Sequence, residues 1–587
     1  MQRALLPLLT LSLLAADVAP QTTTRISVDA LGNQADGPST SPALSYDGRF
    51  AAFESQAPNL VPGDTNNMRD IFVVELASGA IERVNLANSG AQANSLCTHP
   101  VLSGEGRFVA YHSSADSLVL GDTNGTSDVF LRDRWLGTTT LVSATPSGAA
   151  GNSLSSFASI SLDGRYIAFS SLASDLVPGD TNGTTDVFVR DAVAGTTERV
   201  SVSSAGAQGD GYSTFPAISG DGRFVVFQSF ASDLVAGDTN GESDVFVHDR
   251  QAGTTERVSV SSAGTQADGP SSNITISADG RFLAFQSAAT NLVASDTNGT
   301  DDVFLRDRLA GATTLVSVSF GGGQGDQPCV TPVLSADGRC IAFVCLSEQL
   351  IAGDSNFARD VILQDLVSGD LENISVDSFG VQADDLSVAP ALDASGTRVL
   401  FQSFAQNLVP NDTNLAHDVF LRLRGPFHPV SCAGDGSLPT SCPCGNTGAA
   451  GHGCASSAVA AGGVLEGEGG TNLDAVTLAA HELLPHALSI FLQGDNVAVM
   501  GLPFGDGLRC TAGVLRRLYT RNANGGIVSA PGPLDLGLRA RAQALGDPLP
   551  PGSLRIYQVY YRDPSASFCP APQGGTWNIT NAVSVQW

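Results

Sequence analysis

The chain has 587 residues, of which 42% are apolar and 15% are charged. This balance supplies apolar surface for a sizeable core and argues against wholesale disorder. The 58 acidic residues outnumber the 30 basic ones, which gives a net charge of −28. Such a charge excludes nucleic acid as a natural partner, because neutralising phosphates needs a basic surface. Every basic residue is an arginine, so chemistry that requires a lysine is also excluded.

The first 20 residues predict a secretory signal peptide. Arg3 precedes an apolar run at residues 4–16 that is too short to span a bilayer, and Ala16 and Ala19 offer cleavage points. No later apolar run is long enough for a membrane span, so no transmembrane segment is expected. The mature chain is therefore predicted to be secreted or periplasmic.

A repeat organises most of the chain. The turn phrase that holds Asp47 in LSYDGRF, the loop phrase GDTN and the strand phrase DVF each recur seven times at a spacing of 58 residues, without insertions. Such a period indicates a repeat architecture. In the fourth copy the pattern predicts strands over 215–219, 223–228, 244–249 and 256–260. Four antiparallel strands repeated radially form a β-propeller.

The ends of the repeat predict how the ring closes. The seventh copy stops at Arg424 without its fourth strand, whereas Thr24-Arg25-Ile26-Ser27-Val28 matches the fourth strand Glu198-Arg199-Val200-Ser201-Val202. Residues 24–28 are therefore expected to complete the last blade and remove an open sheet edge. The expected fold is all-β, a seven-bladed propeller closed by an N-terminal strand.

The repeat also resembles a known family. The phrase Ser161-Leu162-Asp163-Gly164-Arg165-Tyr166-Ile167-Ala168-Phe169, followed by DVFVRD at 186–191, is similar to the WD40-like (PD40) repeat of TolB-type propellers over about residues 24–424. TolB itself has an α/β domain before a six-bladed propeller, and this sequence shows seven copies and no such domain. The resemblance implies the propeller fold, and TolB's partners are not carried over.

Oxygen ligands recur in the loop before the third strand of each copy. The pattern D-x-N-x-x-x-D offers two carboxylates and an amide, which are groups that Ca²⁺ prefers. The candidate metal ligands are Asp64, Asn66, Asp70, Asp122, Asn124, Asp128, Asp180, Asn182, Asp186, Asp238, Asn240, Asp244, Asp296, Asn298, Asp302, Asp354, Asn356, Asp360, Asp412, Asn414 and Asp418. The alternative is purely local structure, because Asp and Asn side chains also bond their own backbone in turns. Calcium is the only cofactor that the sequence indicates.

No catalytic residue is assigned, because near-identical loops supply equal groups whereas catalysis needs unequal roles. The exceptions are Cys97, His99, Tyr111 and His112 in the second copy and Cys329, Cys340 and Cys345 in the sixth. The favoured function is a non-catalytic scaffold, expected to be a monomer, that binds a protein or glycan on an acidic propeller face. The alternative is a metal-dependent hydrolase or lyase with its site at the channel mouth.

The last part of the chain predicts a second domain. Residues 1–20 are the signal peptide, 21–424 the propeller, 425–430 a linker and 431–587 a small, disulfide-rich, β-sandwich-like domain. An even cluster of cysteines in an exported chain favours disulfides over zinc. The candidates are Cys432, Cys442, Cys444, Cys454, Cys510 and Cys569.

The phrases CPCGN at 442–446, FGDGLRC at 504–510 and YQVYYRD at 557–563 resemble a Cys-rich C-terminal β module of bacterial secreted proteins. That resemblance implies secretion or surface attachment.

Overall fold

The computed structural model describes residues 22–424, apart from 320, 321, 352 and 368, together with parts of the C-terminal region. These parts are residues 427–430, 464–468, 477–481, 483, 486–494, 496–504, 507–512, 515–524, 527–531, 535–547, 549, 554–562 and 577–586. The chain divides into two compact units at Arg424 and Gly425, with Thr22–Arg424 as one unit. The predicted signal peptide lies outside the described residues.

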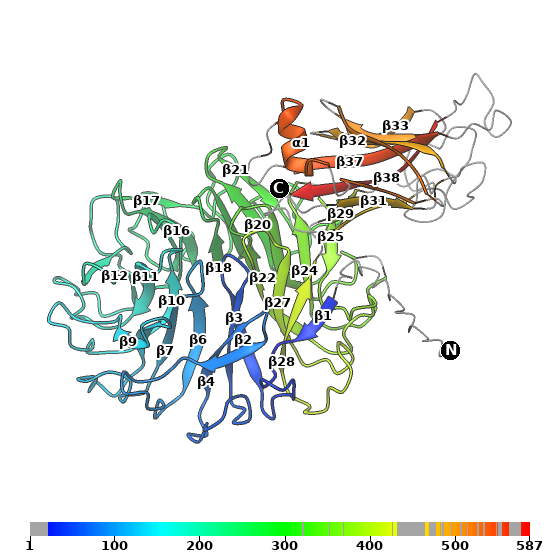
Figure 1. Ribbon diagram of the computed structural model, residues 1–587. Helices are drawn as coiled ribbons and strands as arrows, with labels where there is room; N and C mark the ends of the chain where they lie inside the picture. The colour runs from blue at the N-terminus through cyan, green and yellow to red at the C-terminus, as the bar shows by residue number, and fades with distance from the viewer. Residues whose placement is uncertain are drawn as a thin grey trace, which may run out of the picture. The chain divides into compact units, whose positions relative to one another are not determined.

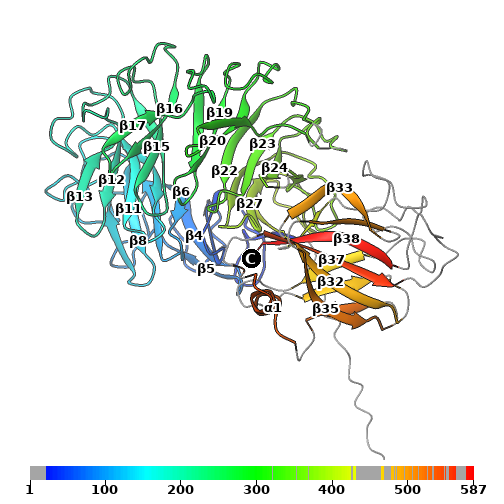
Figure 2. The same cartoon turned by 90° about the horizontal axis from the view of Figure 1, so that it is seen from above.

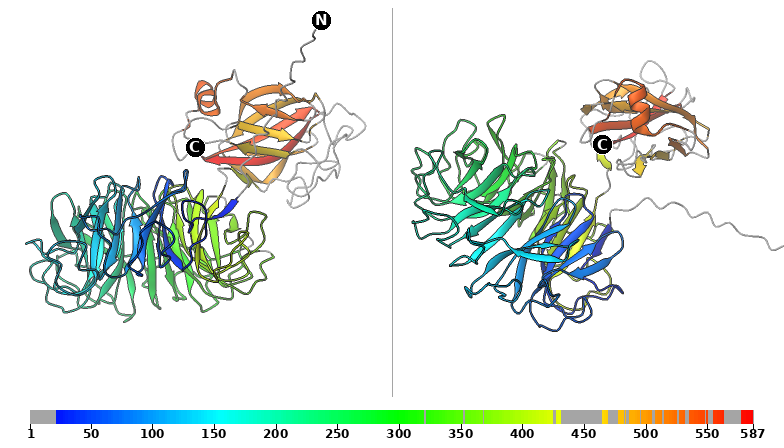
Figure 3. Two further views of the ribbon diagram at one scale, coloured as in Figure 1. Left: turned by 60° about the horizontal axis from the view of Figure 1, so that its bottom comes forward. Right: turned by 60° about the vertical axis from the view of Figure 1, so that its left-hand side comes forward.

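Residues 22–424 form four-stranded antiparallel sheets in chain order (Figures 1 and 3). Sheet 1 contains β2 (Ser39–Leu44), β3 (Phe50–Ser55), β4 (Asp70–Glu75) and β5 (Ala80–Arg83). Sheet 2 contains β6 (Cys97–Leu102), β7 (Phe108–Ser113), β8 (Asp128–Asp133) and β9 (Thr138–Leu141). Sheet 3 contains β10 (Ser155–Ile160), β11 (Tyr166–Ser171), β12 (Asp186–Asp191) and β13 (Thr196–Arg199). Sheet 4 contains β14 (Ser213–Ile218), β15 (Phe224–Ser229), β16 (Asp244–Asp249) and β17 (Thr254–Arg257). Sheet 5 contains β18 (Ser271–Ile276), β19 (Phe282–Ser287), β20 (Asp302–Asp307) and β21 (Ala312–Leu315). Sheet 6 contains β22 (Cys329–Leu334), β23 (Cys340–Cys345), β24 (Asp360–Asp365) and β25 (Leu371–Asn373).

Sheet 7 joins the two ends of this unit. Its strands are β26 (Ser387–Leu392), β27 (Arg398–Ser403), β28 (Asp418–Leu423) and β1 (Thr22–Arg25). Strand β1 pairs with β28 from Thr22↔Leu423 to Arg25↔Phe420, and Figure 1 shows the two side by side. The predicted N-terminal strand is thus present two residues earlier than expected. Strand β2 of sheet 1 also contacts β26, β27 and β28 of sheet 7.

The core of this unit lies between neighbouring sheets. Phe169 and Phe188 stack within sheet 3 with ring centroids 5.9 Å apart, and equivalent pairs recur in other sheets. The turn glycines hold adjacent sheets close together. Gly222 has φ +74°, and a Cβ there would lie 2.3 Å from Tyr166 Cδ2 of the preceding sheet. The Asp-Gly turn of the repeat phrase is therefore required both by its backbone conformation and by the packing.

The repeat arginines bridge the second and third strands of their sheets. Arg165 pairs with Asp191 at 2.7 Å and Arg223 with Asp249 at 2.6 Å. Asp191 has its pKa lowered to about 2, chiefly by the hydrogen bond from Arg165. These pairs near the surface show that the arginine of the repeat phrase has a structural role.

The C-terminal unit is also mostly β. It contains a sheet in the order β29 (Phe427–Val430), β38 (Trp577–Gln586), β37 (Leu554–Arg562), β32 (Leu488–Gly494) and β35 (Arg516–Asn522) (Figure 2). A second sheet has β30 (Val464–Glu468), β31 (Thr477–His481) and β36 (Val528–Ala530), and a third has β33 (Asn496–Phe504) and β34 (Gly507–Ala512). Helix α1 (Leu538–Ala544) buries Leu538 and Ala542 and was not expected from the sequence. None of the described helical residues forms a segment able to span a bilayer.

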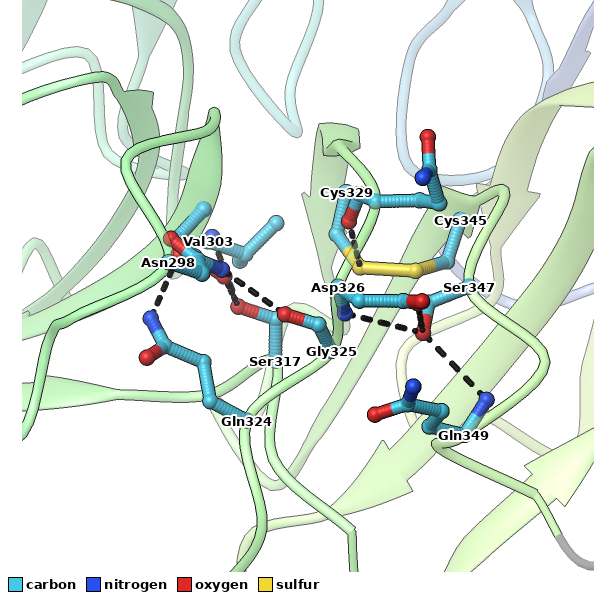
Figure 4. The surroundings of a disulfide bond; sticks show 12 residues. Asn298, Val303, Ser317, Gln324, Gly325, Asp326, Cys329, Cys345, Ser347 and Gln349 are labelled. Atoms are coloured by element: carbon cyan, nitrogen blue, oxygen red, sulfur yellow. Dashed lines mark hydrogen bonds between the residues drawn. A yellow bond between two sulfur atoms is a disulfide. The ribbon is translucent and has the colours of Figure 1, made fainter.

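A disulfide joins Cys329 and Cys345 across β22 and β23 of sheet 6 (Figure 4). At the same position other sheets carry a buried serine pair, such as Ser213 and Ser229, whose hydroxyls lie 2.9 Å apart. The disulfide was not among the candidate pairs. Cys432, Cys442, Cys444, Cys454 and Cys569 lie outside the described residues, and Cys510 lies in β34 with its side chain not described.

Replacing Ile26 by alanine tests the docking of β1. Ile26 is buried among residues of sheets 1 and 7, so the change is expected to lower the free energy of unfolding by about 2–4 kcal/mol. Thr24→Ala is the matched control, because Thr24 is exposed in the same segment. Thermal melts that do not separate the two variants would contradict the docking of this segment.

The variant Cys329→Ser/Cys345→Ser tests the disulfide. It recreates the serine pair of other sheets and should therefore fold. The disulfide closes a loop of sequence separation 16, and its loss is expected to cost about 3 kcal/mol of unfolding free energy. A reductant should lower the Tm of the parent protein and leave that of the double variant unchanged. An equal response of both proteins would argue against the bond.

Candidate functional site

The loops predicted to bind metal bring their three side chains close to one another. In sheet 3, Asp186 is fully buried at the start of β12, and Asn182 Nδ2 donates to its Oδ2 at 3.2 Å. Gln208 Nε2 donates to Asp180 at 2.7 Å and to Asp186 at 2.8 Å, and Ser201 Oγ donates to Asp186 at 2.6 Å. Side-chain donors of the protein thus satisfy the carboxylate oxygens.

The amide of the loop asparagine also has structural partners. Asn182 Oδ1 accepts from Thr184 N at 3.1 Å, while its Nδ2 donates to Gly209 O at 3.0 Å. In the part of the chain that the structure describes, no group of three or more His, Cys, Asp or Glu side chains could hold a metal ion. Calcium binding by these loops stays a prediction.

Seven equivalent positions break the symmetry of the repeat. The third residue of each first strand lies at a β-bulge and has φ between 49° and 53°. This left-handed conformation is unfavourable for residues other than glycine, and such strain concentrates at functional sites. The residues are Ser41, His99, Phe157, Phe215, Asn273, Thr331 and Ala389. They share a backbone but not a side-chain type, so this position is where the sheets differ chemically.

The aromatic members of this set form one cluster on sheets 2 to 4. The rings of Phe157 and Phe215 have centroids 4.3 Å apart, and His99 lies 5.7 Å from Phe157. His99 also stacks on His112 of β7 at 5.0 Å. Phe215 retains 40% exposure although it is a large apolar side chain. Direct contacts between the first strands of successive sheets allow these rings to meet.

A second aromatic pair lies at the same end of the strands. Tyr212 and Phe230 stack at 4.6 Å and flank the paired residues Ser213 and Ser229 of sheet 4. Both are about 40% exposed, with 42% for Tyr212 and 40% for Phe230. We define the aromatic face as His99, Phe157, Tyr212, Phe215 and Phe230, together with the exposed Leu96, Leu154 and Leu172.

The remaining equivalent positions are small or polar. Asn273 Nδ2 donates to Gln286 Oε1 at 2.8 Å, and Ser41 N donates to Gln402 Oε1 at 2.9 Å. The first strands therefore carry aromatic residues at this position in sheets 2 to 4 and the small or polar residues Ser41, Asn273, Thr331 and Ala389 in the other sheets. An exposed apolar face bordered by polar groups is typical of an interaction site.

The acidic loops leave from the same end of the sheets as the aromatic face. In sheet 1, Ser39 pairs with Ser55, and Ser55 in turn pairs with Asp70. The loops that precede β2 and that connect β3 to β4 therefore start at one end. Residues 1–424 carry 48 acidic and 22 basic residues, a balance of −26. The surroundings of the aromatic face thus disfavour polyanionic ligands.

The histidines of the cluster are not arranged as an acid–base pair. Burial and the neighbouring His99 lower the pKa of His112 to about 4, so its imidazole is neutral at pH 7. Its Nε2 lies 2.8 Å from Thr98 Oγ1. Glu54 accepts from the His99 backbone N–H at 2.9 Å and from Arg69 at 2.9 Å. Among the described residues, no carboxylate is hydrogen-bonded to either imidazole, and such an orienting group is usual for a catalytic base.

Cys97 and Cys340, which are the buried free cysteines of the described residues, are also unsuited to nucleophilic chemistry. Burial raises the pKa of the Cys97 thiol to about 12 and that of the Cys340 thiol to about 12. A nucleophilic cysteine needs a lowered pKa and solvent access. Both residues therefore serve packing.

Sequence reasoning identified His99 and His112 but missed Phe157, Phe215, Tyr212 and Phe230. The available signal was the alignment of the repeats. At a spacing of 58 residues, the columns of Phe157 and Tyr212 vary in residue type while their neighbours repeat. Seeing that the rings converge required the bulge and the contacts between first strands.

The comparisons with known proteins give distant structural similarity. No protein-family model and no curated protein matches the chain. TolB from Acinetobacter baumannii is 15% identical, with a TM-score of 0.31 over 67% of this chain and 82% of that one. Oligogalacturonate lyase in complex with manganese is 12% identical, with a TM-score of 0.43 over 70% and 94% of the two chains.

The propeller domain of the Trilobed protease from Pyrococcus furiosus, described as having an open velcro topology, is 10% identical. Its TM-score is 0.42 over 66% of this chain and 95% of that one. The solved structures similar to this chain thus include TolB and other propeller proteins. Similarity at this level assigns no activity to this chain.

The neutral state of His112 predicts a pH dependence of stability. Its folded pKa of about 4 lies below the ordinary 6.5, so the unfolded state binds the proton first as the pH falls. The stabilising effect of a neutral His112 is complete above pH 6.5 and is lost between pH 6.5 and about 4.

His112→Gln is the comparison, because glutamine occupies this repeat position in Gln228, Gln286 and Gln402. As the pH falls through this window, the unfolding free energy of the parent should decrease relative to that of the variant. Asp128, whose pKa burial raises to about 6, titrates in both proteins and cancels in the difference. A difference independent of pH would contradict a buried neutral imidazole.

Proposed function

We propose that this chain is an extracytoplasmic binding protein that captures a protein or glycan ligand on the aromatic face without catalysing a reaction. The observation that carries this proposal is the asymmetry of a repeated scaffold. Sheets 2 to 4 place the exposed His99, the half-buried Phe157 and the exposed Phe215 at strained positions where other sheets place small or polar residues. Strained backbone persists where the surrounding structure enforces it, commonly at functional sites.

We further propose that the seven sheets are blades of one closed propeller. Two contacts support closure: β1 completes the sheet of β28, and β2 packs against β26 to β28. Backbone hydrogen bonds agree, since Ala394 N donates to Tyr46 O at 2.9 Å between sheets 7 and 1. In a closed ring the aromatic face lies at one mouth of the central channel.

The chemistry of the face favours a ligand with apolar surface and little negative charge. Aromatic rings bury the apolar faces of sugar rings or of peptide side chains, and polar groups on the opposite first strands add directional hydrogen bonds. The acidic surroundings repel polyanions. Neutral glycans and protein surfaces meet both conditions.

An extracytoplasmic location fits the disulfide and the leader. The bond between Cys329 and Cys345 is of a kind that persists in oxidising compartments. The apolar run at residues 4–16 supports export by a signal peptide. The ligand is thus one that is met outside the cytoplasm.

A metal-dependent hydrolase or lyase at the same mouth is the alternative. The observation that favours it is the stacked pair His99 and His112, whose rings are 5.0 Å apart. Metal-dependent turnover of a substrate by the parent protein, lost in the His99→Ala and His112→Ala variants, would support this alternative and overturn simple binding.

The test of the binding proposal is a glycan and secreted-protein screen with the full chain, followed by the double variant Phe157→Ala/Phe215→Ala. Loss of two aromatic anchors is expected to weaken binding by about tenfold or more. Asn273→Ala/Thr331→Ala is the matched control at the same repeat positions, and it should bind more tightly than the aromatic variant. Equal affinity of the two variants would place the ligand elsewhere.

A further inference from the structure

A buried cation belongs to most of the repeats. In four of the sheets the fourth strand supplies an arginine whose Nη1 lies between the two loop aspartates. Arg83 lies 2.9 Å from Asp64 and 3.4 Å from Asp70, and Arg199 lies 3.4 Å from Asp180 and 3.8 Å from Asp186. Arg257 lies 3.3 Å from both Asp238 and Asp244. Arg25 lies 3.3 Å from Asp412 and 3.4 Å from Asp418.

The guanidinium also has a carbonyl partner in this position. Arg199 Nη2 donates to Gly179 O at 3.4 Å, and Arg257 Nη2 donates to Gly237 O at 3.3 Å. Two carboxylates and one backbone carbonyl therefore form a preformed guanidinium site within the repeat. The arginine side chains that fill it are only about a tenth exposed, with 9% for Arg83 and 11% for Arg199.

Sheet 6 keeps this arrangement but lacks the arginine. Asn373 occupies its position, and a cavity of about 480 Å³ opens there, lined in part by Asn373, Gly353, Gln382 and Asp384. Gly353 is the repeat equivalent of Gly179 and Gly237. The cavity thus borders the position that an arginine fills in four other sheets, and the carbonyl-bearing loop lines it. Asp354 and Asp360 lie behind the lining residues Gln382 and Asn356, which donate hydrogen bonds to them.

The two aspartates of sheet 6 are present without a cation. Asp360 is fully buried and Asn356 Nδ2 donates to it at 3.0 Å, while Gln382 Nε2 donates to Asp354 at 3.2 Å. Burial raises the pKa of Asp360 to about 6, and no arginine contributes to the pKa of either aspartate. In sheet 3 burial also raises the pKa of Asp186, but there the charge of Arg199 counteracts part of that rise.

Asparagine and glutamine donors do not block such a site. In sheet 3, Asn182 and Gln208 donate to the same aspartates that also hold Arg199. The other two sheets without arginine carry Leu141 and Leu315, which pack as apolar side chains against the core. Among the three, sheet 6 alone replaces the arginine by a short polar side chain.

We propose that the cavity of sheet 6 binds the guanidinium group of a ligand, in the place that Arg25, Arg83, Arg199 and Arg257 fill in sheets 7, 1, 3 and 4. Asp354 and Asp360 supply the charge, and the Gly353 carbonyl accepts from the far nitrogen. The ligand is an arginine side chain of a peptide or partner, or a small alkylguanidine. This site is separate from the aromatic face, so the two proposals stand or fall independently.

The test uses ethylguanidinium, ethylammonium and Ca²⁺ as probes on the full chain at constant ionic strength. At about ten times its dissociation constant, ethylguanidinium is expected to raise the Tm by roughly 2 °C or more through binding linkage. The blocking variant is Asn373→Arg, which copies four other sheets and should fold. It is expected to have a higher Tm than the parent and to lose the response to ethylguanidinium.

A second variant makes the test independent of Asn373→Arg. Arg199→Asn copies sheet 6 into sheet 3 and should create a further ethylguanidinium site, which calorimetry would record as doubled stoichiometry. Stabilisation by Ca²⁺ without stabilisation by ethylguanidinium would overturn the proposal, as would an equal ethylguanidinium response in the parent and Asn373→Arg. The absence of any response to all three probes would also overturn it.

Discussion

The structure of the repeat depends on a carboxylate that is buried in every sheet. The first residue of each third strand is a fully buried aspartate: Asp70, Asp128, Asp186, Asp244, Asp302, Asp360 and Asp418. A buried charge is tolerated only when it is hydrogen-bonded or paired. In sheet 3 the partners of Asp186 are Asn182 in the loop before it, Ser201 just after the fourth strand and Gln208 in the loop to the next sheet. One carboxylate thereby fixes the loop before the third strand and the segment that follows the fourth strand.

This requirement explains why the acidic loops vary so little. Replacing Asn182, Ser201 or Gln208 would remove a donor from a desolvated carboxylate, and an unsatisfied buried charge is costly. The acidity of this face is therefore first a property of the fold. The sheets differ from one another in residue type at positions outside this network. Examples are the bulge residues His99, Phe157 and Phe215, whose side chains the repeated hydrogen bonds do not require.

The sequence predicted most of the fold because the period determines the sheets. In sheet 4 the predicted strand over 244–249 coincides with β16, and the other three differ by one to three residues at their ends. The N-terminal strand was found by its match to other fourth strands, although β1 begins two residues earlier. Helix α1 was missed because seven residues give little periodic signal.

The candidate site was less accessible to prediction, for physical reasons. Phe157 reaches Phe215 because a bulge places each residue at positive φ, and no local pattern in Ser-Ser-Phe-Ala predicts that conformation. Cys329 and Cys345 pair because β22 and β23 are in register, which the serine pairs of the other repeats could have revealed. Both findings depend on comparing equivalent positions across repeats rather than on any single segment.

Sheet 6 departs from the repeat at several positions. It carries Cys340 where the sheets 1 to 5 have an aromatic residue, and Asn373 in place of arginine, so it loses both ring packing and an ion pair. The disulfide between Cys329 and Cys345 ties β22 and β23 covalently. The departures of this sheet thus concern its second strand, which carries Cys340, as well as its fourth strand, which carries Asn373, and local rules are typically broken where a protein gains a site. The cavity beside Asn373 is therefore best understood together with the disulfide, as two parts of one specialised sheet.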